Sequence, residues 1–234
     1  MWIKICGITS LEDAQLAIHA GADAIGFVFA TSPRQMTPKA AREITKELPS
    51  SVEKIGVFVD ASTEEIIAAC EMAGLSGVQL HGEYPADQAS DLHMRLKKNS
   101  AQLRVVRVVH YDGDAHSFAQ RLRDLRAQSV ADATLNAVLV DTRMVGKLGG
   151  TGVSFDWRSA QDSFRHQSAN LRLIAAGGLH PENIREAIQT LHPWGVDVSS
   201  GVESVPGRKD RQRVMEFIRA ARAAATEFAE AAQR

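Results

Sequence analysis

Seven side chains suited to proton transfer or anion binding stand at or just beyond the ends of short apolar runs in this sequence. They are Cys6, Arg34, Asp60, His81, His110, Asp141 and Asp197. Proton-transfer chemistry needs one group that takes a proton and one that gives it. A thiolate serves as a base where a helix end or a cation favours it, and a carboxyl group that closes an apolar run is suited to act as an acid. Cys6 is therefore the candidate base and Asp141 the candidate acid.

Two further apolar runs break into glycine and serine. Gly177 and Gly178 follow one of them, and Ser199, Ser200 and Gly201 follow the other. Small residues let backbone N–H groups approach an anion closely, and a helix after each turn adds the positive end of its dipole. Two such turns separated by one helix fit the phosphate site that barrel enzymes build after strands 7 and 8. We therefore expect a phosphorylated small molecule as the ligand.

These residues would be positioned by eight apolar, β-branched runs that alternate with segments of helical period. The predicted strands are Trp2–Cys6, Ala24–Phe29, Lys54–Val59, Gly77–Leu80, Arg104–Val109, Ala137–Val140, Arg172–Ala175 and Gly195–Ser199. Such a pattern indicates a parallel sheet covered by helices. The fingerprint G-x-G-x-x-G is absent after the first run, which favours a closed (β/α)8 TIM barrel over an open doubly wound sheet. We expect one domain over residues 1–234, with a helical or frayed tail after about residue 224.

Local signals mark where several helices begin. They are Ser10 with Asp13 three residues on, Pro38, the segment 62–73, the pair Pro181-Glu182 and the stretch from Gly207 to Asp210. In the last of these helices, Val214, Phe217, Ile218 and Ala221 are expected to face inward. The glycine-rich stretch 143–153 follows the sixth strand, so it is either a phosphate-contacting or mobile lid segment or a plain connector.

Each candidate also has a plainer interpretation. A free cysteine is usually an inert buried residue, as we expect Cys70 to be, whereas Cys6 lies where reactive groups converge in a barrel. Asp141 could accept backbone N–H bonds in the next loop, and Arg34 could be a surface residue. His81 could be a hydrogen-bonded residue of the wall. If Arg34 lies over the barrel mouth, its planar fork suits a substrate carboxylate.

Composition narrows the class of protein further. A net charge of −1 over 234 residues argues against a general electrostatic grip on nucleic acid or anionic membrane. A disulfide scaffold is unnecessary at this size, so the two cysteines fit a reducing compartment, and we find neither a secretion signal nor an apolar run that could span a bilayer. The eight histidines show no metal-binding spacing. We expect a cytoplasmic protein that needs no metal.

The motifs of the chain, taken in order, resemble the phosphoribosylanthranilate isomerase family of tryptophan biosynthesis. The resemblance runs from residue 2 to about 220 and is carried by Lys4–Thr9, Gly21–Phe29, Ser32–Arg34, Gly56–Val59, Val78–Gly82, Leu139–Thr142, Gly149–Gly152, Phe155–Trp157, Ala176–Leu179 and Asp197–Glu203. That family is a (β/α)8 barrel. The stretches Lys97–Gln102 and Gln128–Ala133 are longer than the family needs, but they precede strands and so lie away from the expected chemistry.

The resemblance implies an Amadori rearrangement of N-(5'-phosphoribosyl)anthranilate to 1-(2-carboxyphenylamino)-1-deoxyribulose 5-phosphate. Asp141 would protonate the furanose ring oxygen, and Cys6 would remove the C2′ proton. Arg34 would hold the anthranilate carboxylate, Asp197 would face the sugar hydroxyls, and His81 would line the mouth beside the substrate. Backbone groups in the predicted phosphate turns, together with Gly152, would hold the phosphate. The reaction needs no cofactor, because the substrate nitrogen is the electron sink, and a monomer or a homodimer fits equally well.

Three rival interpretations are disfavoured by particular residues. Indole-glycerol-phosphate synthase would need a lysine acid on a barrel strand, whereas the third predicted strand ends in Val57-Phe58-Val59-Asp60. The aminoimidazole-ribotide isomerase of histidine synthesis is expected to carry an aspartate in place of Cys6. A non-catalytic phosphate-binding barrel need not retain Cys6 and Asp141 together.

Overall fold

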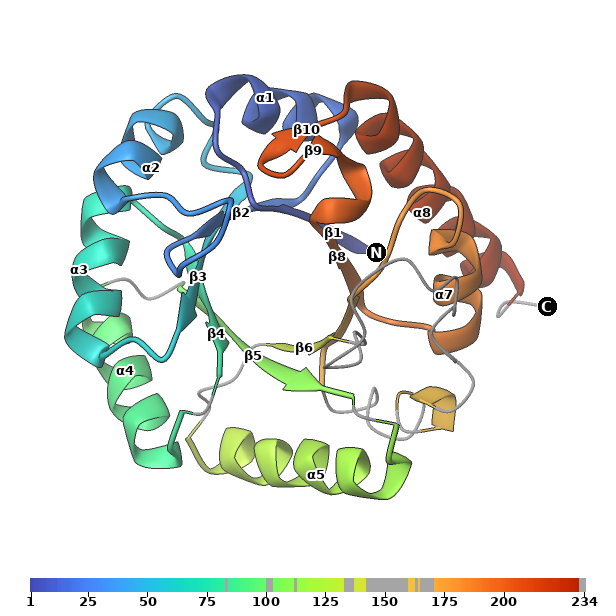
Figure 1. Cartoon of the computed structure of the whole chain (residues 1–234). Helices are drawn as coiled ribbons and strands as arrows, with labels where there is room; N and C mark the ends of the chain where they lie inside the picture. The colour runs from blue at the N-terminus through green and yellow to red at the C-terminus, as the bar shows by residue number, and fades with distance from the viewer. Residues whose placement is uncertain are drawn as a thin grey trace.

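Eight parallel strands close into a barrel in the order of the chain, as the sequence predicts. The computed structural model describes residues 1–82, 84–99, 103–111, 113–132, 137–141, 160–162, 164 and 171–231. Strand β1 is hydrogen-bonded to both β2 and β8, which closes the ring seen in Figure 1. The strands are β1 (Trp2–Cys6), β2 (Ala24–Val28), β3 (Glu53–Val59), β4 (Gly77–His81), β5 (Arg104–His110), β6 (Ala137–Asp141), β7 (Leu173–Ala176) and β8 (Gly195–Val198).

Helices surround the barrel on its outer side (Figure 1). They are α1 (Leu11–Ala20), α2 (Pro38–Thr45), α3 (Thr63–Ala73), α4 (Ala86–Asn99), α5 (Ala115–Asp132), α7 (Ile184–Leu191) and α8 (Arg211–Ala231). The predicted caps at Ser10 and Ser62 are present, since each hydroxyl accepts a hydrogen bond from the backbone N–H three residues later. Pro38 is in the first turn of α2, where it has no hydrogen bond to lose.

Two helices begin later in the chain than the sequence predicts. Asn183 is the N-cap residue of α7, so Pro181-Glu182 lies in the turn before that helix. Helix α8 begins at Arg211 because the stretch before it forms an antiparallel hairpin of β9 (Glu203–Val205) and β10 (Arg208–Lys209). Gly207 allows the turn between these strands, since its φ of +84° is in the left-handed region.

Strand alternation divides the apolar core into two parts. One part lies inside the barrel and consists of Trp2, Ala24, Ile55, Val106, Ala137, Leu139, Ile174 and Ala176. The other fills the space between the strands and the surrounding helices. The inward-facing residues predicted for α8 are buried there, and Ala224 extends that buried stripe. None of the helices that the structure describes is long and apolar enough to cross a membrane.

Candidate active site

The inner face of the barrel changes from apolar to polar toward the carboxyl ends of the strands. Cys6, His81, His110 and Asp141 are the last residues of β1, β4, β5 and β6, and Asp197 is the third residue of β8. Strand alternation points these side chains into the barrel, on the same face as the inner apolar cluster. Asp60 is exposed in the turn after β3, beside Gly82, the residue that follows His81. The structure thus gathers most of the predicted acid–base residues at one end of the barrel.

A buried lysine that sequence analysis passed over connects two of these residues. Lys4 lies two residues before Cys6 on the inner face of β1, and only 1% of it is exposed. Its ammonium donates to Gln79 Oε1 over 2.8 Å and to Asp197 Oδ1 over 3.1 Å. Burial acts to lower the Lys4 pKa, but the Asp197 carboxylate raises it overall and keeps the ammonium charged.

Cys6 lies beside this charged pair. Burial raises the pKa of the Cys6 thiol and Asp197 adds to that rise, while the ammonium groups of Lys4 and Lys209 oppose it. The cations that a reactive thiol requires are therefore present, but burial outweighs them. Cys70, packed in the core on α3, has no such cations, and burial raises its pKa to about 12. The two cysteines thus lie in different surroundings, as expected.

Gly26 leaves the space that the Lys4 and Cys6 side chains share. It is in register with Cys6 on the neighbouring strand β2. A Cβ at this position would lie 2.8 Å from Cys6 Sγ and 2.9 Å from Lys4 Cε, closer than real Cβ atoms come. A larger residue on β2 would consequently displace one of the two side chains.

Arg34 is held by a carboxylate. Its Nε and Nη2 atoms donate to the two carboxylate oxygens of Glu203 over 2.7 and 2.5 Å. This paired fork raises the Arg34 pKa. Burial would raise the pKa of Glu203, but hydrogen bonds from Arg34 and Lys209 lower it overall. Glu203 uses one edge of the guanidinium and leaves the Nη1 edge, so Arg34 still has donors for a second carboxylate.

Lys209 completes this group from the hairpin. Its ammonium donates to Glu203 Oε1 over 2.8 Å and to the backbone oxygens of Cys6 and Ser199 over 2.6 and 3.3 Å. Burial lowers its pKa in spite of Glu203. One buried lysine therefore ties the end of β1 to the end of β8.

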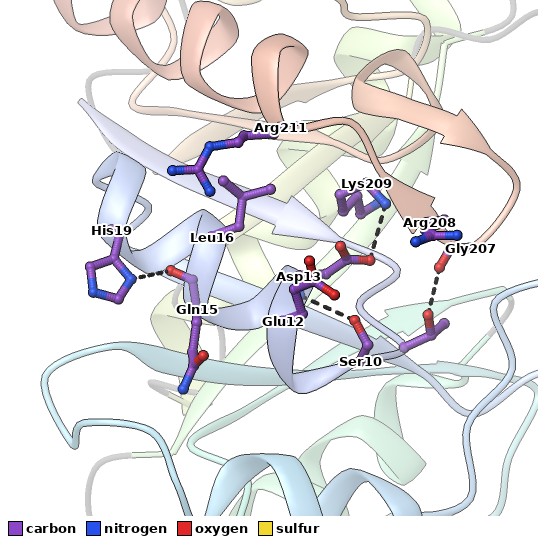
Figure 2. Close-up of a pocket in the computed structure, with 11 residues that line it drawn as sticks. Ser10, Glu12, Asp13, Gln15, Leu16, His19, Gly207, Arg208, Lys209 and Arg211 are labelled. Carbon is purple, nitrogen blue, oxygen red and sulfur yellow. Dashed lines mark hydrogen bonds between the residues drawn. The ribbon is translucent and has the colours of Figure 1, made fainter.

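Figure 2 shows how the hairpin that carries Lys209 is fastened to α1. The backbone N–H of Lys209 donates to Asp13 Oδ2 over 3.0 Å, and the Thr9 hydroxyl donates to the Gly207 carbonyl over 2.5 Å. Asp13 was expected to take part in the helix start at Ser10. Its backbone N–H does donate to the Ser10 hydroxyl, but its carboxylate accepts from the β10 backbone instead. The cleft in Figure 2 lies along the outer surface of α1, away from the inward side chains of the strands.

The two predicted phosphate turns touch each other. Gly177 and Gly178 have φ angles of +86° and +66°, which favour glycine. Asn183 fixes this turn by accepting from the His180 N–H over 2.8 Å and donating to the Gly178 carbonyl over 3.0 Å. Gly201, in the second turn, lies so close to Leu179 that a Cβ would be 1.8 Å from its carbonyl oxygen. The turns after β7 and β8 therefore form one surface, as a shared anion would require.

The histidines and Asp141 lie on neighbouring strands. Asp141 is in register with His110, and only 5% of it is exposed. The rings of His81 and His110 meet edge to face, with centroids 4.9 Å apart. Gly152 and the stretch 143–153 lie outside the described residues. Among the residues that the structure describes, no three histidine, cysteine or carboxylate side chains could hold a metal ion together.

A closed parallel barrel with acid–base side chains at the strand ends and glycine turns after β7 and β8 defines the (β/α)8-barrel class of enzymes. Comparison with known proteins narrows the class. Residues 3–220 match the family model described as N-(5'-phosphoribosyl)anthranilate (PRA) isomerase. A relative of that name from Trichlorobacter lovleyi is 40% identical over 224 residues, which are 95% of this chain and 98% of the relative.

Solved structures agree. Phosphoribosyl anthranilate isomerase from Thermotoga maritima superposes with a TM-score of 0.80 and 37% identity, covering 95% of this chain and 99% of that one. A second structure, of the isomerase in complex with reduced 1-(o-carboxyphenylamino)-1-deoxyribulose 5-phosphate, gives a TM-score of 0.78 and 36% identity over the same shares. The chain belongs to the N-(5'-phosphoribosyl)anthranilate isomerase family, enzymes of tryptophan biosynthesis.

Proposed function

We propose that Cys6 is the general base and Asp141 the general acid of an Amadori rearrangement of N-(5'-phosphoribosyl)anthranilate. The observation that carries the proposal is the placement of both groups, inward, at the carboxyl ends of β1 and β6, the end of the barrel at which enzymes of this fold do their chemistry. Asp141 gives its proton to the furanose ring oxygen, and the ring opens to an iminium. Cys6 then takes the C2′ proton, and the electrons move to the substrate nitrogen to form an enolamine.

The enolamine becomes the ketone when C1′ gains a proton and the C2′ hydroxyl loses one. The isomerisation is therefore redox-neutral and needs no cofactor. The product, 1-(2-carboxyphenylamino)-1-deoxyribulose 5-phosphate, is an isomer of the substrate in which the ring C1′–O bond is broken, C1′ is a methylene and C2′ is a ketone. Because one catalytic group must be protonated and the other deprotonated, we expect a bell-shaped dependence of kcat/KM on pH.

The remaining polar groups are assigned to binding. The Nη1 edge of Arg34 receives the anthranilate carboxylate, while Glu203 holds the opposite edge. The backbone N–H groups of Gly177, Gly178, Ser199, Ser200 and Gly201 receive the phosphate, and Gly152 joins them. Asp197 and His81 face the sugar. Supporting this arrangement, the two turns are in contact and Lys209 joins the end of β1 to the second of them.

The direct test follows anthranilate fluorescence while the purified protein consumes freshly made phosphoribosylanthranilate. Cys6→Ala and Asp141→Asn should each lower kcat by at least the roughly 10²–10⁴ typical of a positioned base or acid. Cys70→Ala is the matched control and should keep its kcat, since that thiol is packed in the core on α3. Equal, small effects of the two cysteine substitutions would refute the base. A fully active Asp141→Asn protein would refute the acid.

A further inference from the structure

The proposed base, Cys6, is a buried thiol that must lose its proton before it can act. Burial raises the pKa of the Cys6 thiol, so the group that must accept a proton is disfavoured in its reactive form. Among the residues that the structure describes, four charged groups besides Cys6 itself act at this place: Lys4 on β1, Asp197 on β8, Lys209 on β10 and Arg34 after β2. Each of the three cations has a carboxylate partner, Asp197 for Lys4 and Glu203 for the other two, and they differ in what else they contact.

Lys209 and Arg34 both form ion pairs with the Glu203 carboxylate, which neutralises part of their combined charge. The Lys209 ammonium also donates to two backbone oxygens, those of Cys6 and Ser199, rather than to the thiol. Arg34 also has a second proposed role, since its remaining edge is assigned to the substrate carboxylate. Neither residue is placed to respond mainly to the thiol.

Lys4 is placed differently. It shares the inner face of β1 with Cys6, and both side chains occupy the space left by Gly26. Because Sγ and Cε each lie under 3 Å from one point, they are within about 6 Å of each other, the range over which a charge changes the ionisation of its neighbour. Gln79 and Asp197 fix the ammonium from β4 and β8, so it cannot turn away.

We propose that Lys4 is a positioning residue whose buried ammonium stabilises the thiolate of Cys6. Asp197 and Gln79 hold that ammonium in place, and Gly26 keeps the space between the two side chains open. The assignment rests on the proposed role of Cys6 as the base. Asp197 has two opposing effects on the ionisation of Cys6, since its carboxylate anchors the Lys4 ammonium and also repels the thiolate.

The test measures the ionisation of Cys6 directly, without substrate. Protein labelled with 13C at the cysteine Cβ gives two signals, since the chain has two cysteines, and Cys6→Ser identifies which is which. The pH at which the Cys6 signal moves reports formation of the thiolate. Lys4→Met should raise this midpoint by at least about one unit, the lower end of what a neighbouring charge achieves.

Two further variants make the result specific. Asp197→Asn should lower the midpoint, because it removes the repelling carboxylate and leaves the ammonium. If Lys4→Met does not fold with an unpaired Asp197, the double variant Lys4→Met/Asp197→Asn replaces it and should have a higher midpoint than Asp197→Asn alone. Lys54→Met is the matched control. Lys54 is also a buried strand lysine, but its ammonium donates to the Pro49 carbonyl over 2.7 Å, and its loss should leave the midpoint unchanged.

Two outcomes would overturn the proposal. One is a Cys6 midpoint that stays the same or falls when Lys4 is removed. The other is an equal shift in Lys54→Met. If the midpoint rises in Lys4→Met as expected but Cys6→Ala stays active, Lys4 stabilises the thiolate but the thiolate is not the base. Failure of the proposed mechanism is thereby distinguished from failure of this proposal.

Discussion

Replacing Gly201 with alanine should separate the two turns that we assign to the phosphate. The new Cβ would lie 1.8 Å from the Leu179 carbonyl oxygen and 2.9 Å from the carbonyl carbon, whereas real Cβ atoms essentially never come closer than 3.0 Å. Since these atoms belong to the backbone, no rotamer change relieves the contact, and one turn must move by roughly 1 Å. Overpacking of this kind costs about 1–3 kcal/mol of stability.

The functional loss should exceed the loss of stability. A displacement of about 1 Å at groups that position a substrate can cost on the order of 10²-fold. The assay compares the urea midpoint and the affinity for inorganic phosphate, followed by isomerase kinetics. Gly178→Ala is the comparison, because a Cβ there meets nothing within 4 Å and carries only the strain of a positive φ. Phosphate affinity that is unchanged in Gly201→Ala would refute the idea that the two turns act as one site.

Three other substitutions test the rest of the site. Arg34→Ala should mainly raise KM, because a carboxylate held equally in ground and transition states contributes uniform binding, and affinity for inorganic phosphate should survive. Loss of both affinities together would contradict the assignment. Glu203→Gln should cost about 3 kcal/mol at pH 7, because the buried Lys209 and the half-buried Arg34 lose their counter-ion. Because the pKa of Glu203 is lowered, its contribution to folding stability is present above the ordinary carboxyl pKa of about 4 and is lost as the pH falls through the folded value. The difference in Tm between the unmodified protein and Glu203→Gln should therefore narrow on acidification. A difference independent of pH would show that charge is not the cause. Gly26→Ala should lower kcat as well as stability, because its Cβ displaces Cys6 or Lys4, and a variant with full kcat would show that the shared space does not matter.

The barrel could be predicted because each of its strands is an apolar run that ends in a recognisable turn. Every predicted strand is present with ends that differ by no more than one residue. This holds because a parallel barrel strand is covered on both faces, and covered strands are continuous apolar runs. Helix starts were predicted where a side chain caps its own helix, as at Ser62. They were missed at Asn183, whose side chain bonds the preceding turn.

The hairpin was missed although one signal for it exists. Pro206-Gly207 is a turn pair, but the strands on either side of it have only three and two residues, too few for any periodicity. The same stretch was read as the first turn of the last helix. The contact of the Asp13 carboxylate was missed for a related reason, because its partner Lys209 lies 196 residues away in the chain.

The site residues show where sequence reasoning ends. Cys6 and Asp141 could be singled out because each closes a run. Lys4 could not be assigned a role, since its partners lie 75 and 193 residues away and only the closed barrel brings them together. A lysine within an apolar run, two residues before a candidate base, was nevertheless a visible signal. Likewise Glu203 and Arg34 are 169 residues apart, and nothing local to either predicts their ion pair.

Because the barrel closes between β1 and β8, the site can form only when both ends of the chain are present. The backbone carbonyl of Cys6 on β1 accepts a hydrogen bond from Lys209, and Arg222 on α8 donates to Asp23 just before β2. A growing chain that lacks these residues holds its candidate base on an open sheet edge, with β1 unpaired on one side. Contacts of such sequence separation are formed late and slowly. The ribosome must therefore release nearly the whole chain before the first strand it made can support chemistry.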